Sequence, residues 1–379
     1  MKKNHLLAPG PTPVPQPVLE AMAKPLFHHR TSEFESHFAD IRDGLEWLYQ
    51  VKSDVISLAS SGTGGMEACV SNLLSVGEKV LVVEGGKFGE RWSEICQAYG
   101  VIPDVLSVIP GHSVNITDLE AKLIEGNYSA VLIQASETST GSKHDIQGVS
   151  QSIKKASPDT LLVVDAITAL GVYDVQPEDW GLDAVVTGSQ KALMLPPGLA
   201  FVWLSENAWK RTEKSNCPSY YFNLEIERKS QKKNTTAWTP AISLMMGLKV
   251  ALSMMQEEGL EKIYQRHAKL SKSTREAIES MGLNIFTKDL IAECLTAVEV
   301  PQGINGKDIP KKMQSDCGVT IAGGQGELSD KIFRIGHLGY VDGDDVLVAV
   351  SALEKTLLEL GCKFKKSVGI AAAQRSLLQ

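Results

Sequence analysis

A lysine and an aspartate, each following a short apolar run, are the residues of this chain that most clearly suggest chemistry. Lys191 comes shortly after the apolar run 184–186, and Asp165 comes directly after the run 161–164. Burial among apolar residues lowers the pKa of a lysine, so that part of its amine is neutral and can attack an aldehyde. A buried carboxylate is costly unless a cation pairs with it. Together the two residues predict a site for a carbonyl compound that also carries a cationic group.

Pyridoxal phosphate meets both requirements. Its aldehyde forms a Schiff base with a lysine, and its ring nitrogen stays protonated beside a carboxylate. The ring can then accept the electrons released when a substrate Cα–H bond breaks. We therefore predict pyridoxal phosphate as the cofactor, with Lys191 and Asp165 as the catalytic residues.

A turn of small residues is the candidate site for the cofactor phosphate. Ser61, Gly62 and Thr63 open a predicted helix that runs through residue 74. Backbone N–H groups and the helix dipole at such a position bind anions. The turn lacks the lysine of a P-loop and does not fit the dinucleotide-binding glycine pattern. Taken alone, it is also compatible with a plain structural turn.

Two further candidates follow other apolar runs. Phe88 lies in a glycine-rich turn after the run 79–83, where its ring suits stacking on a pyridine ring, with a core aromatic as the alternative. Thr138 lies in the hydroxyl-rich segment 136–141 and is our candidate for a hydrogen bond to the phenolic oxygen of the ring. A helix-capping turn explains that segment equally well.

Arg334 is the candidate for binding the substrate. It lies inside a strand-like apolar segment, where an unpaired cation is expensive. Its planar guanidinium suits the α-carboxylate of an amino acid, and a structural salt bridge is the alternative. No second arginine is clearly placed for a side-chain carboxylate, which disfavours aspartate or glutamate as substrates.

Alternating strands and helices must position these residues. Continuous Val-rich runs are typical of strands buried on both faces, and their alternation with helical segments favours an α/β fold with a mainly parallel sheet. Ligands of such sheets bind at the carboxyl ends of the strands, where Asp165 and Lys191 fall. The predicted strands are the runs 79–83, 130–133, 161–164, 184–186 and 199–203.

The chain divides into three predicted regions. Five prolines within residues 8–17 predict an extended arm lying on another surface, and we assign residues 1–20 to it. A large cofactor-binding domain follows at 21–258, and a smaller α+β domain at 259–379. A helical stretch with a break at Gly259 joins the two. The smaller domain is predicted to contain strands at 295–300 and 331–335 and helices at 307–316 and 343–360.

The bulk composition excludes several classes of protein. The chain has 379 residues, of which 43% are hydrophobic and 22% charged, as in ordinary globular proteins. Its net charge of -7 argues against a nucleic-acid partner. It has neither an apolar run that could span a bilayer nor a recognisable signal peptide, so we expect a cytoplasmic protein without a membrane partner. Its six scattered cysteines form no Cys-x-x-Cys pair, so we expect no metal site.

These motifs together resemble the class V aminotransferases of pyridoxal phosphate fold type I, in particular the alanine–glyoxylate and serine–glyoxylate aminotransferases. The fold expected from this resemblance is a large domain with a mainly parallel, seven-stranded-type sheet and a smaller C-terminal α+β domain. The chain also resembles a cyanobacterial branch described as soluble hydrogenase small subunits. The resemblance covers most of the chain, and its most specific blocks are Ser-Gln-Lys-Ala-Leu at 189–193 and Arg-Ile-Gly-His-Leu-Gly at 334–339.

The resemblance implies roles for individual residues. Lys191 is the Schiff-base lysine, Asp165 the partner of the ring nitrogen and Phe88 the stacking residue. Gln190 would hold the cofactor phosphate together with residues 61–63.

It also implies a homodimer with the active site at the subunit interface. Thr236 and Thr239 would reach the phosphate bound by the neighbouring subunit. Gly10 would contact the substrate carboxylate through its backbone, beside Arg334.

The expected reaction moves an amino group from serine or alanine to glyoxylate, giving glycine and hydroxypyruvate or pyruvate. Transamination of phosphoserine, aspartate or ureidoglycine is an alternative. Cysteine desulfuration is another, and Cys317, before Gly318, is its nearest candidate nucleophile. A third alternative is a non-catalytic subunit associated with a hydrogenase.

Overall fold

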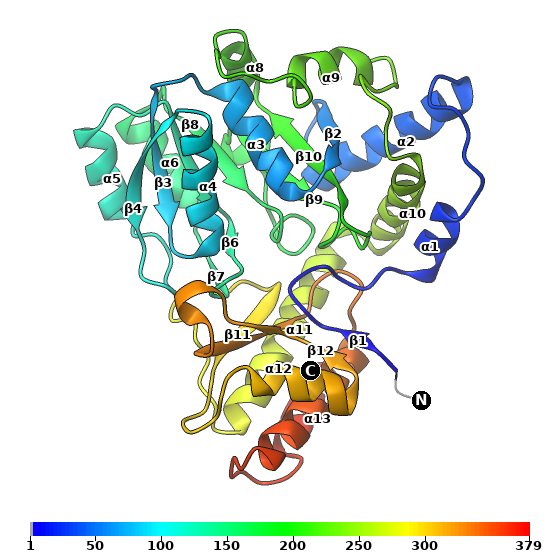
Figure 1. The fold of residues 1–379 in the computed structure, drawn as a ribbon, viewed down its shortest axis with the longest axis vertical. Coiled ribbons are helices and arrows are strands. Elements are labelled where there is room, and N and C mark those ends of the chain that lie inside the picture. Colours follow the sequence, from blue (N-terminus) through cyan, green and yellow to red (C-terminus); the bar gives the residue numbers. More distant parts are fainter. Residues whose placement is uncertain (1–2) are drawn as a thin grey trace.

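A seven-stranded sheet organises the larger part of the protein, whose computed structural model describes residues 3–379 (Figure 1). Its strands lie in the order β2-β10-β9-β8-β5-β3-β4. Their bounds are β2 (Val55–Ser60), β3 (Lys79–Glu84), β4 (Ile102–Ser107), β5 (Ala130–Gln134), β8 (Leu161–Asp165), β9 (Ala184–Gly188) and β10 (Gly198–Leu204).

The sheet is mainly parallel, as predicted. Strand β10 alone is reversed: it runs antiparallel to both β9 and β2, so β2 points in the same direction as β9. The carboxyl ends of the other six strands therefore meet at one edge of the sheet. Strands β2 and β4 were not predicted from the sequence. Ser57 interrupts the apolar run of β2, and β4 is an edge strand that carries Pro103 and an exposed Ile102.

Helices cover both faces of this sheet, because alternate strand residues point to opposite sides. Val80 and Val82 pack towards α3, α4 and α8, whereas Leu81 and Val83 pack towards the helices of the other face. The helices of the first face are α3 (Gly62–Leu73), α4 (Lys87–Ala98) and α8 (Glu206–Thr212). Those of the second are α2 (Ser32–Tyr49), α5 (Ile116–Glu125), α6 (Ile146–Ala156) and α10 (Ile242–Glu258), and two short helices, α7 (Pro177–Trp180) and α9 (Leu224–Gln231), lie in connections.

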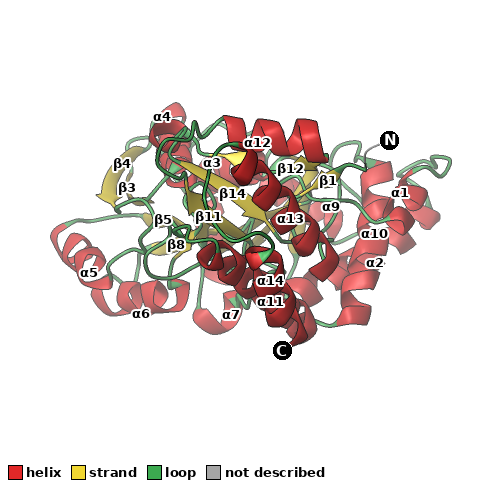
Figure 2. Ribbon diagram, turned by 90° about the horizontal axis from the view of Figure 1, so that it is seen from below, coloured by secondary structure: helices red, strands yellow, loops and turns green. Residues whose placement is uncertain are grey.

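The remaining elements form a smaller α+β unit below the large sheet (Figure 1). A three-stranded antiparallel sheet, in the order β11-β14-β13, packs against four helices, which Figure 2 shows in front of it. The bounds are β11 (Leu295–Glu299), β13 (Ala322–Gly323), β14 (Ile332–Gly336), α11 (Leu260–Ser280), α12 (Asp308–Lys312), α13 (Gly343–Glu359) and α14 (Val368–Leu378). The helix predicted at 307–316 is divided in the structure, since a π-helical turn, Met313–Cys317, follows α12.

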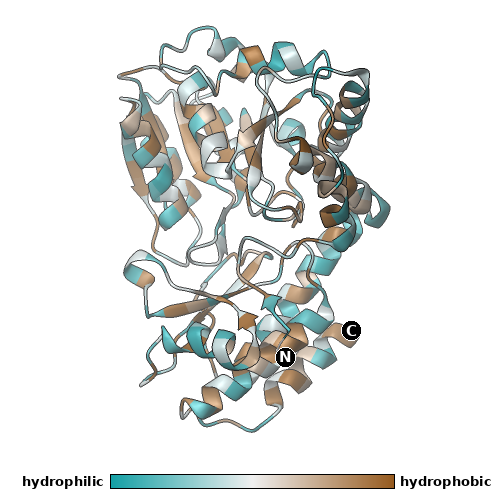
Figure 3. Ribbon diagram, turned by 45° about the vertical axis from the view of Figure 1, so that its right-hand side comes forward, coloured by the Kyte–Doolittle hydropathy of each residue, from teal (hydrophilic) through white to brown (hydrophobic). Residues whose placement is uncertain are grey.

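Two backbone features match the sequence pattern closely. Helices α10 and α11 meet at Gly259, the predicted break, where φ is +82° and glycine is favoured. The inner strands of the large sheet are mainly apolar, and the helices that cover the sheet turn hydrophilic faces outward (Figure 3). Among residues 3–379, no helix has both the length and the apolar character needed to cross a bilayer.

The N-terminal segment lies against the smaller unit and then returns to the larger one. Strand β1 (His5–Leu6) pairs in parallel with β12 (Val319–Thr320). The chain has no regular secondary structure from Leu7 to Pro15, but α1 (Gln16–Met22) begins before residue 17, so the predicted extended arm was too long. Proline is tolerated in the first turn of a helix, where its missing N–H has no intrahelical partner. The segment between β1 and α1 passes directly over Lys191.

Candidate active site

Most of the predicted cofactor-binding residues lie at the carboxyl edge of the large sheet. Asp165 is the last residue of β8, and Lys191 follows the end of β9 by three residues. Ser61 follows β2, and Phe88 follows β3. Thr138 comes shortly after β5, in a small hairpin made of β6 (Ser136–Glu137) and β7 (Ser142–Lys143). Because these strands run the same way, the topology itself brings their ends together.

The amine of Lys191 is held in a largely desolvated position. Its Nζ donates a hydrogen bond to the carbonyl oxygen of Pro9 at 2.6 Å. Burial lowers the pKa of Lys191 to about 8, and the cations of Arg334 and Arg91 act in the same direction. With such a pKa, roughly a tenth of the amine is neutral at pH 7, which is what attack on an aldehyde requires.

Backbone contacts fix Lys191 from the N-terminal segment. The Thr12 hydroxyl donates to the carbonyl oxygen of Lys191 at 2.9 Å, and the Thr12 N–H donates to that of Gln190 at 3.2 Å. At Gly10 φ is +145°, a backbone conformation that L side chains rarely adopt, and a Cβ atom there would press against the Lys191 amine. The backbone conformation therefore favours glycine at this position. That Gly10 contacts a substrate carboxylate stays a prediction.

Asp165 shares this site with Lys191. It is 5% exposed, and its Oδ1 accepts a hydrogen bond from the Ile167 N–H at 2.8 Å. Burial raises the pKa of Asp165 to about 6, while Lys191 acts to lower it. The two side chains influence each other but form no direct ion pair within residues 3–379. This arrangement suits two groups that hold different ends of one cationic ring.

The turn before α3 has the features of an anion cradle. Ser61 is the N-cap residue of α3, yet its side chain makes no capping hydrogen bond, so the first N–H groups of the helix have no side-chain partner. The Gln190 side chain and the backbone of Gly62 both lie within 3.5 Å of a Cβ built on Gly188, so the Gln190 amide adjoins this turn. Its N–H₂ group is a hydrogen-bond donor of the kind that a phosphate requires. The cradle therefore fits a phosphate.

A buried glutamate that the sequence did not single out holds the remaining candidates in place. Glu137 is fully buried, and its carboxylate accepts hydrogen bonds from the N–H groups of Phe88 at 3.1 Å and Gly89 at 3.0 Å. It also accepts from Ser139 N–H and Gln134 Nε2, each at 3.1 Å. Burial raises the pKa of Glu137, and its hydrogen bonds with Ser139, Gly89 and Phe88 oppose that shift. Gly86, the N-cap residue of α4, has no side chain, and Glu137 accepts the hydrogen bonds that a capping side chain would otherwise accept. These bonds also hold Phe88 next to the segment that contains Thr138.

We expect Glu137→Gln to weaken both folding and cofactor binding. One carboxylate oxygen becomes an amide N–H₂ that faces N–H donors, and each unsatisfied donor costs about 1–3 kcal/mol. Urea unfolding of the cofactor-free protein should show this loss, and the Kd for pyridoxal phosphate should rise by about tenfold as Phe88 loses its position.

The matched control for this variant is Glu354→Gln. Glu354 is another buried carboxylate, and it accepts from the N–H groups of Ser367 at 3.0 Å and Gly369 at 2.6 Å, at the start of the remote helix α14. It should lose stability without a change in cofactor affinity. A Glu137→Gln protein with unchanged stability and cofactor affinity would contradict the role given to Glu137.

Among residues 3–379, Arg334 has no acidic partner for a salt bridge. It is 5% exposed on β14, and all its hydrogen bonds go to backbone carbonyls. Nε and Nη2 donate to Gly323 at 3.0 and 2.8 Å, and Nη1 donates to Thr138 at 2.8 Å. Burial lowers the pKa of Arg334 to about 10, although Glu137 acts against the shift. A buried guanidinium bonded only to neutral oxygens is suited to binding a carboxylate.

A second arginine lies near the site, contrary to the expectation from the sequence. Arg91, on α4, donates from Nη1 to the Thr63 hydroxyl at 3.2 Å, and its guanidinium lies 4.8 Å from the centre of the Phe88 ring. It also acts on the pKa of both Asp165 and Lys191. That dicarboxylic substrates are disfavoured stays a prediction. Arg91 was missed because only helix packing brings α4 against the start of α3.

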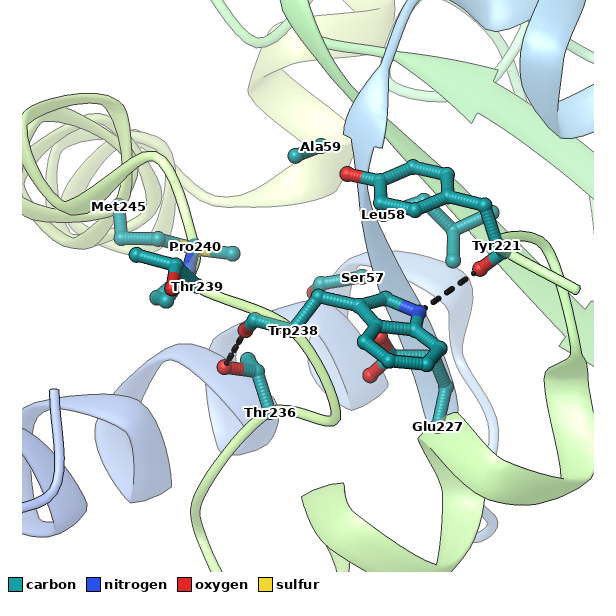
Figure 4. Close-up of a pocket in the computed structure, with 10 residues that line it drawn as sticks. All are labelled: Ser57, Leu58, Ala59, Tyr221, Glu227, Thr236, Trp238, Thr239, Pro240 and Met245. Atoms are coloured by element: carbon teal, nitrogen blue, oxygen red, sulfur yellow. Dashed lines mark hydrogen bonds between the residues drawn. The ribbon is translucent and has the colours of Figure 1, made fainter.

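Thr236 and Thr239 lie in a different place from the other candidates. They line a shallow pocket beside β2, shown in Figure 4, together with Tyr221 and Trp238. None of the residues described around Lys191 belongs to its lining. The Thr236 hydroxyl donates to the Trp238 carbonyl at 2.6 Å, and the Trp238 Nε1 donates to the Tyr221 carbonyl at 2.9 Å. The contact of either threonine with a neighbouring subunit stays a prediction.

The cysteines offer little support for a sulfur nucleophile. Cys317 ends the π-helical turn and packs partly buried in the core of the smaller unit, not in a glycine-rich loop. Cys294 is the cysteine that acts on the pKa of Lys191, and burial raises its own pKa to about 12, which suppresses the thiolate. Among residues 3–379, no three His, Cys, Asp or Glu side chains are grouped as metal ligands would be.

The residues present fit pyridoxal phosphate. Lys191 supplies an amine of lowered pKa, and Asp165 supplies a buried carboxylate for the ring nitrogen. The start of α3 and the Gln190 amide supply an anion cradle, and Phe88 packs against Arg91, which is bonded to Thr63 of that cradle.

Comparison with known proteins agrees with this chemistry. Residues 5–331 match the family described as Aminotransferase class-V. The soluble hydrogenase small subunit of Synechococcus sp. (strain PCC 6716) is 43% identical, over 99% of this chain and 98% of the relative. The serine–glyoxylate aminotransferase of Hyphomicrobium methylovorum is 32% identical, over 97% of this chain and 93% of the relative. The solved aspartate aminotransferase of Thermus thermophilus superimposes with a TM-score of 0.88 at 34% identity, covering 94% of this chain and 100% of its own. The chain therefore belongs to the class V aminotransferases, whose cofactor is pyridoxal phosphate.

Proposed function

We propose that the protein transfers the amino group of a small amino acid, serine or alanine, to glyoxylate, giving glycine and hydroxypyruvate or pyruvate. The observation that carries the proposal is Arg334, a buried guanidinium that forms no ion pair within residues 3–379 and acts on the pKa of Lys191. A cation so placed suits the single carboxylate that serine, alanine and glyoxylate share. The identity to a serine–glyoxylate aminotransferase supports the choice of donor and acceptor.

Each residue has a distinct part in this reaction. The bound cofactor supplies an electron sink for the bond that breaks at the substrate Cα. Arg334 and the backbone of Gly10 orient the substrate carboxylate. The Nζ atom of Lys191 accepts the proton from the Cα of the donor and later returns a proton to the Cα of the nascent glycine. Asp165 keeps a positive charge at the far side of the site, and the buried surroundings of both residues exclude water.

A homodimer is part of the proposal. Tyr220 is 79% and Tyr221 is 45% exposed, and both rings pack against Trp238. Such an exposed aromatic surface is typical of a contact with another protein chain. The neighbouring Thr239 is the better candidate for reaching the partner's cofactor, because the hydroxyl of the buried Thr236 is engaged within its own chain.

Aspartate is the second candidate donor, and Arg91 is the observation that favours it. Its guanidinium lies close enough to Lys191 and Asp165 to affect both, and it pairs with no carboxylate of residues 3–379. A dicarboxylic donor needs a second cation of this kind. The 34% identity to an aspartate aminotransferase points the same way.

A spectral titration tests the proposal. Serine, alanine, aspartate, phosphoserine and cysteine are added separately to the yellow holoenzyme, followed by glyoxylate. We expect serine or alanine to bleach the visible band and glyoxylate to restore it, because Arg334 accommodates one carboxylate. Bleaching by aspartate alone would favour the second candidate, and release of sulfide from cysteine would favour desulfuration.

The matched control is Arg334→Lys, which keeps the charge but loses the planar fork. It should raise the KM for donor and acceptor by about tenfold or more while cofactor affinity stays unchanged. Inactivity with every donor, together with co-purification of a large metalloprotein subunit, would support the hydrogenase-associated alternative.

A further inference from the structure

We propose that Arg91 binds the phosphate group of pyridoxal phosphate, so that a cation from α4 completes the cradle at the start of α3. The inference rests on the proposed placement of the phosphate at residues 61–63. It assigns Arg91 to the phosphate and not to the second carboxylate of a dicarboxylic donor.

Arg91 is held against the cradle by a direct contact. Its Nη1 donates to the hydroxyl of Thr63 at 3.2 Å, and Thr63 is the second residue of α3. This hydrogen bond joins the N-terminal parts of α3 and α4. It brings the guanidinium to the same side of the site as the first N–H groups of α3.

The guanidinium has no anionic partner of its own. It is partly buried, and no carboxylate of residues 3–379 forms an ion pair with it. The neighbouring Glu90 pairs with Lys87 instead. A cation that has lost part of its hydration without gaining an anion is unfavourable. A bound anion at the cradle would remove this cost.

The charge of the ligand argues for such a residue. A phosphate monoester carries a charge of about -1.5 to -2 at neutral pH. The start of α3 offers the equivalent of only about half a positive charge, and Gln190 is neutral. Lys191 is committed to the aldehyde of the cofactor. Arg91 supplies the full charge that the backbone cradle lacks, and its planar fork suits two phosphate oxygens.

Arg91 and Arg334 then lie at different parts of the site, Arg91 beside the phosphate cradle and Arg334 away from it. Arg334 donates to the carbonyl oxygens of Thr138 and Gly323, which belong to other segments than the α3 cradle. Arg91 contacts Thr63 and lies 4.8 Å over the ring of Phe88. The Thr63 contact therefore favours the phosphate over a substrate carboxylate as the partner of Arg91.

A comparison of pyridoxal phosphate with pyridoxal, which lacks the phosphate, tells whether Arg91 binds the phosphate or acts on another part of the site. Cofactor-free wild type, Arg91→Gln and Arg91→Lys are titrated with each compound and followed by visible absorbance. For Arg91→Gln we expect the Kd of pyridoxal phosphate to rise at least about tenfold, because a charge-assisted hydrogen bond is lost. The Kd of pyridoxal should stay within about twofold of the wild-type value. The Kd of Arg91→Lys for pyridoxal phosphate should lie between those of wild type and Arg91→Gln, because lysine keeps the charge but lacks the planar guanidinium.

The control is Arg211→Gln. Arg211 is a partly buried arginine on α8 that pairs with Glu78, remote from the site. It accounts for any general effect of removing an arginine from a packed surface, and both ligands should bind to it as to wild type.

Three outcomes would overturn the assignment. An equal loss of affinity for both ligands in Arg91→Gln would mean that Arg91 acts on the ring through Phe88. Unchanged affinity for pyridoxal phosphate, with a loss of reaction with aspartate but not with alanine, would place Arg91 on the substrate side. If wild type binds pyridoxal and pyridoxal phosphate with the same Kd, the start of α3 is not a phosphate site. A wild type that binds neither compound would instead refute the proposed function.

Discussion

Replacement of Lys191 by alanine is expected to abolish the visible absorption band of the holoenzyme and to reduce transamination by at least about a thousandfold. The amine is the nucleophile that attaches the cofactor and the group that moves the Cα proton, so the variant loses two functions at once. The space it leaves adjoins Gly10 and Pro9, and removal of a buried amine should not destabilise the fold. Absorbance spectra and single-turnover rates with the preferred donor measure the two losses.

Lys79→Ala is the matched control for this variant. Lys79 begins β3 at the opposite edge of the sheet, where its amine pairs with Asp104 at 3.1 Å. The variant should keep the band and the rate, because exposed ion pairs contribute little. Retention of the visible band by Lys191→Ala would show that another amine carries the cofactor, and the site built around Lys191 would be wrong.

Asp165→Asn is expected to cost on the order of a hundredfold or more in kcat, because an amide cannot keep the ring nitrogen protonated. Cofactor binding should weaken much less, since the asparagine oxygen can still accept from the Ile167 N–H. The measurement is kcat at saturating cofactor beside the Kd for pyridoxal phosphate. A variant with nearly wild-type kcat would refute the pairing of Asp165 with the ring.

Although Asp165→Asn should lower kcat, it should raise the stability of the cofactor-free protein. Burial raises the pKa of Asp165 from 3.8 to about 6, so the folded state binds this proton more tightly than the unfolded state does. The free energy of unfolding of the wild type therefore falls as the pH rises from about 4 to about 6, and the loss persists at higher pH. A difference of about two pKa units corresponds to a loss of roughly 3 kcal/mol.

Asp165→Asn lacks this titration. Relative to the cofactor-free wild type, its stability should therefore rise by roughly 3 kcal/mol between about pH 4 and pH 7. Urea unfolding across this range measures the difference. If the free energies of unfolding of the two proteins change in parallel with pH, the ionised form of Asp165 is not destabilised by burial. Saturation with cofactor should remove the advantage of the variant, since only the wild-type carboxylate gains a cationic partner.

The amino-acid sequence alone determined the class of chemistry. Uninterrupted apolar runs before Asp165 and before Lys191 indicated buried strands, and their ends were the positions where a parallel sheet presents functional groups. Gly259 likewise indicated a helix break that the structure has. These features are local, because burial and backbone conformation leave a pattern within a few consecutive residues.

Only the tertiary structure decided which distant residues complete the site. Glu137 is bonded to the start of α4, Arg91 to Thr63, and Lys191 to Pro9, which is 182 positions away in the chain. The edge strand β4, with its polar and exposed residues, is likewise defined by its pairing with β3 and not by an apolar pattern of its own. Such contacts leave no periodic signal in the chain, because each is created when separate helices and strands pack, and the partner of a polar side chain is then set by proximity in space.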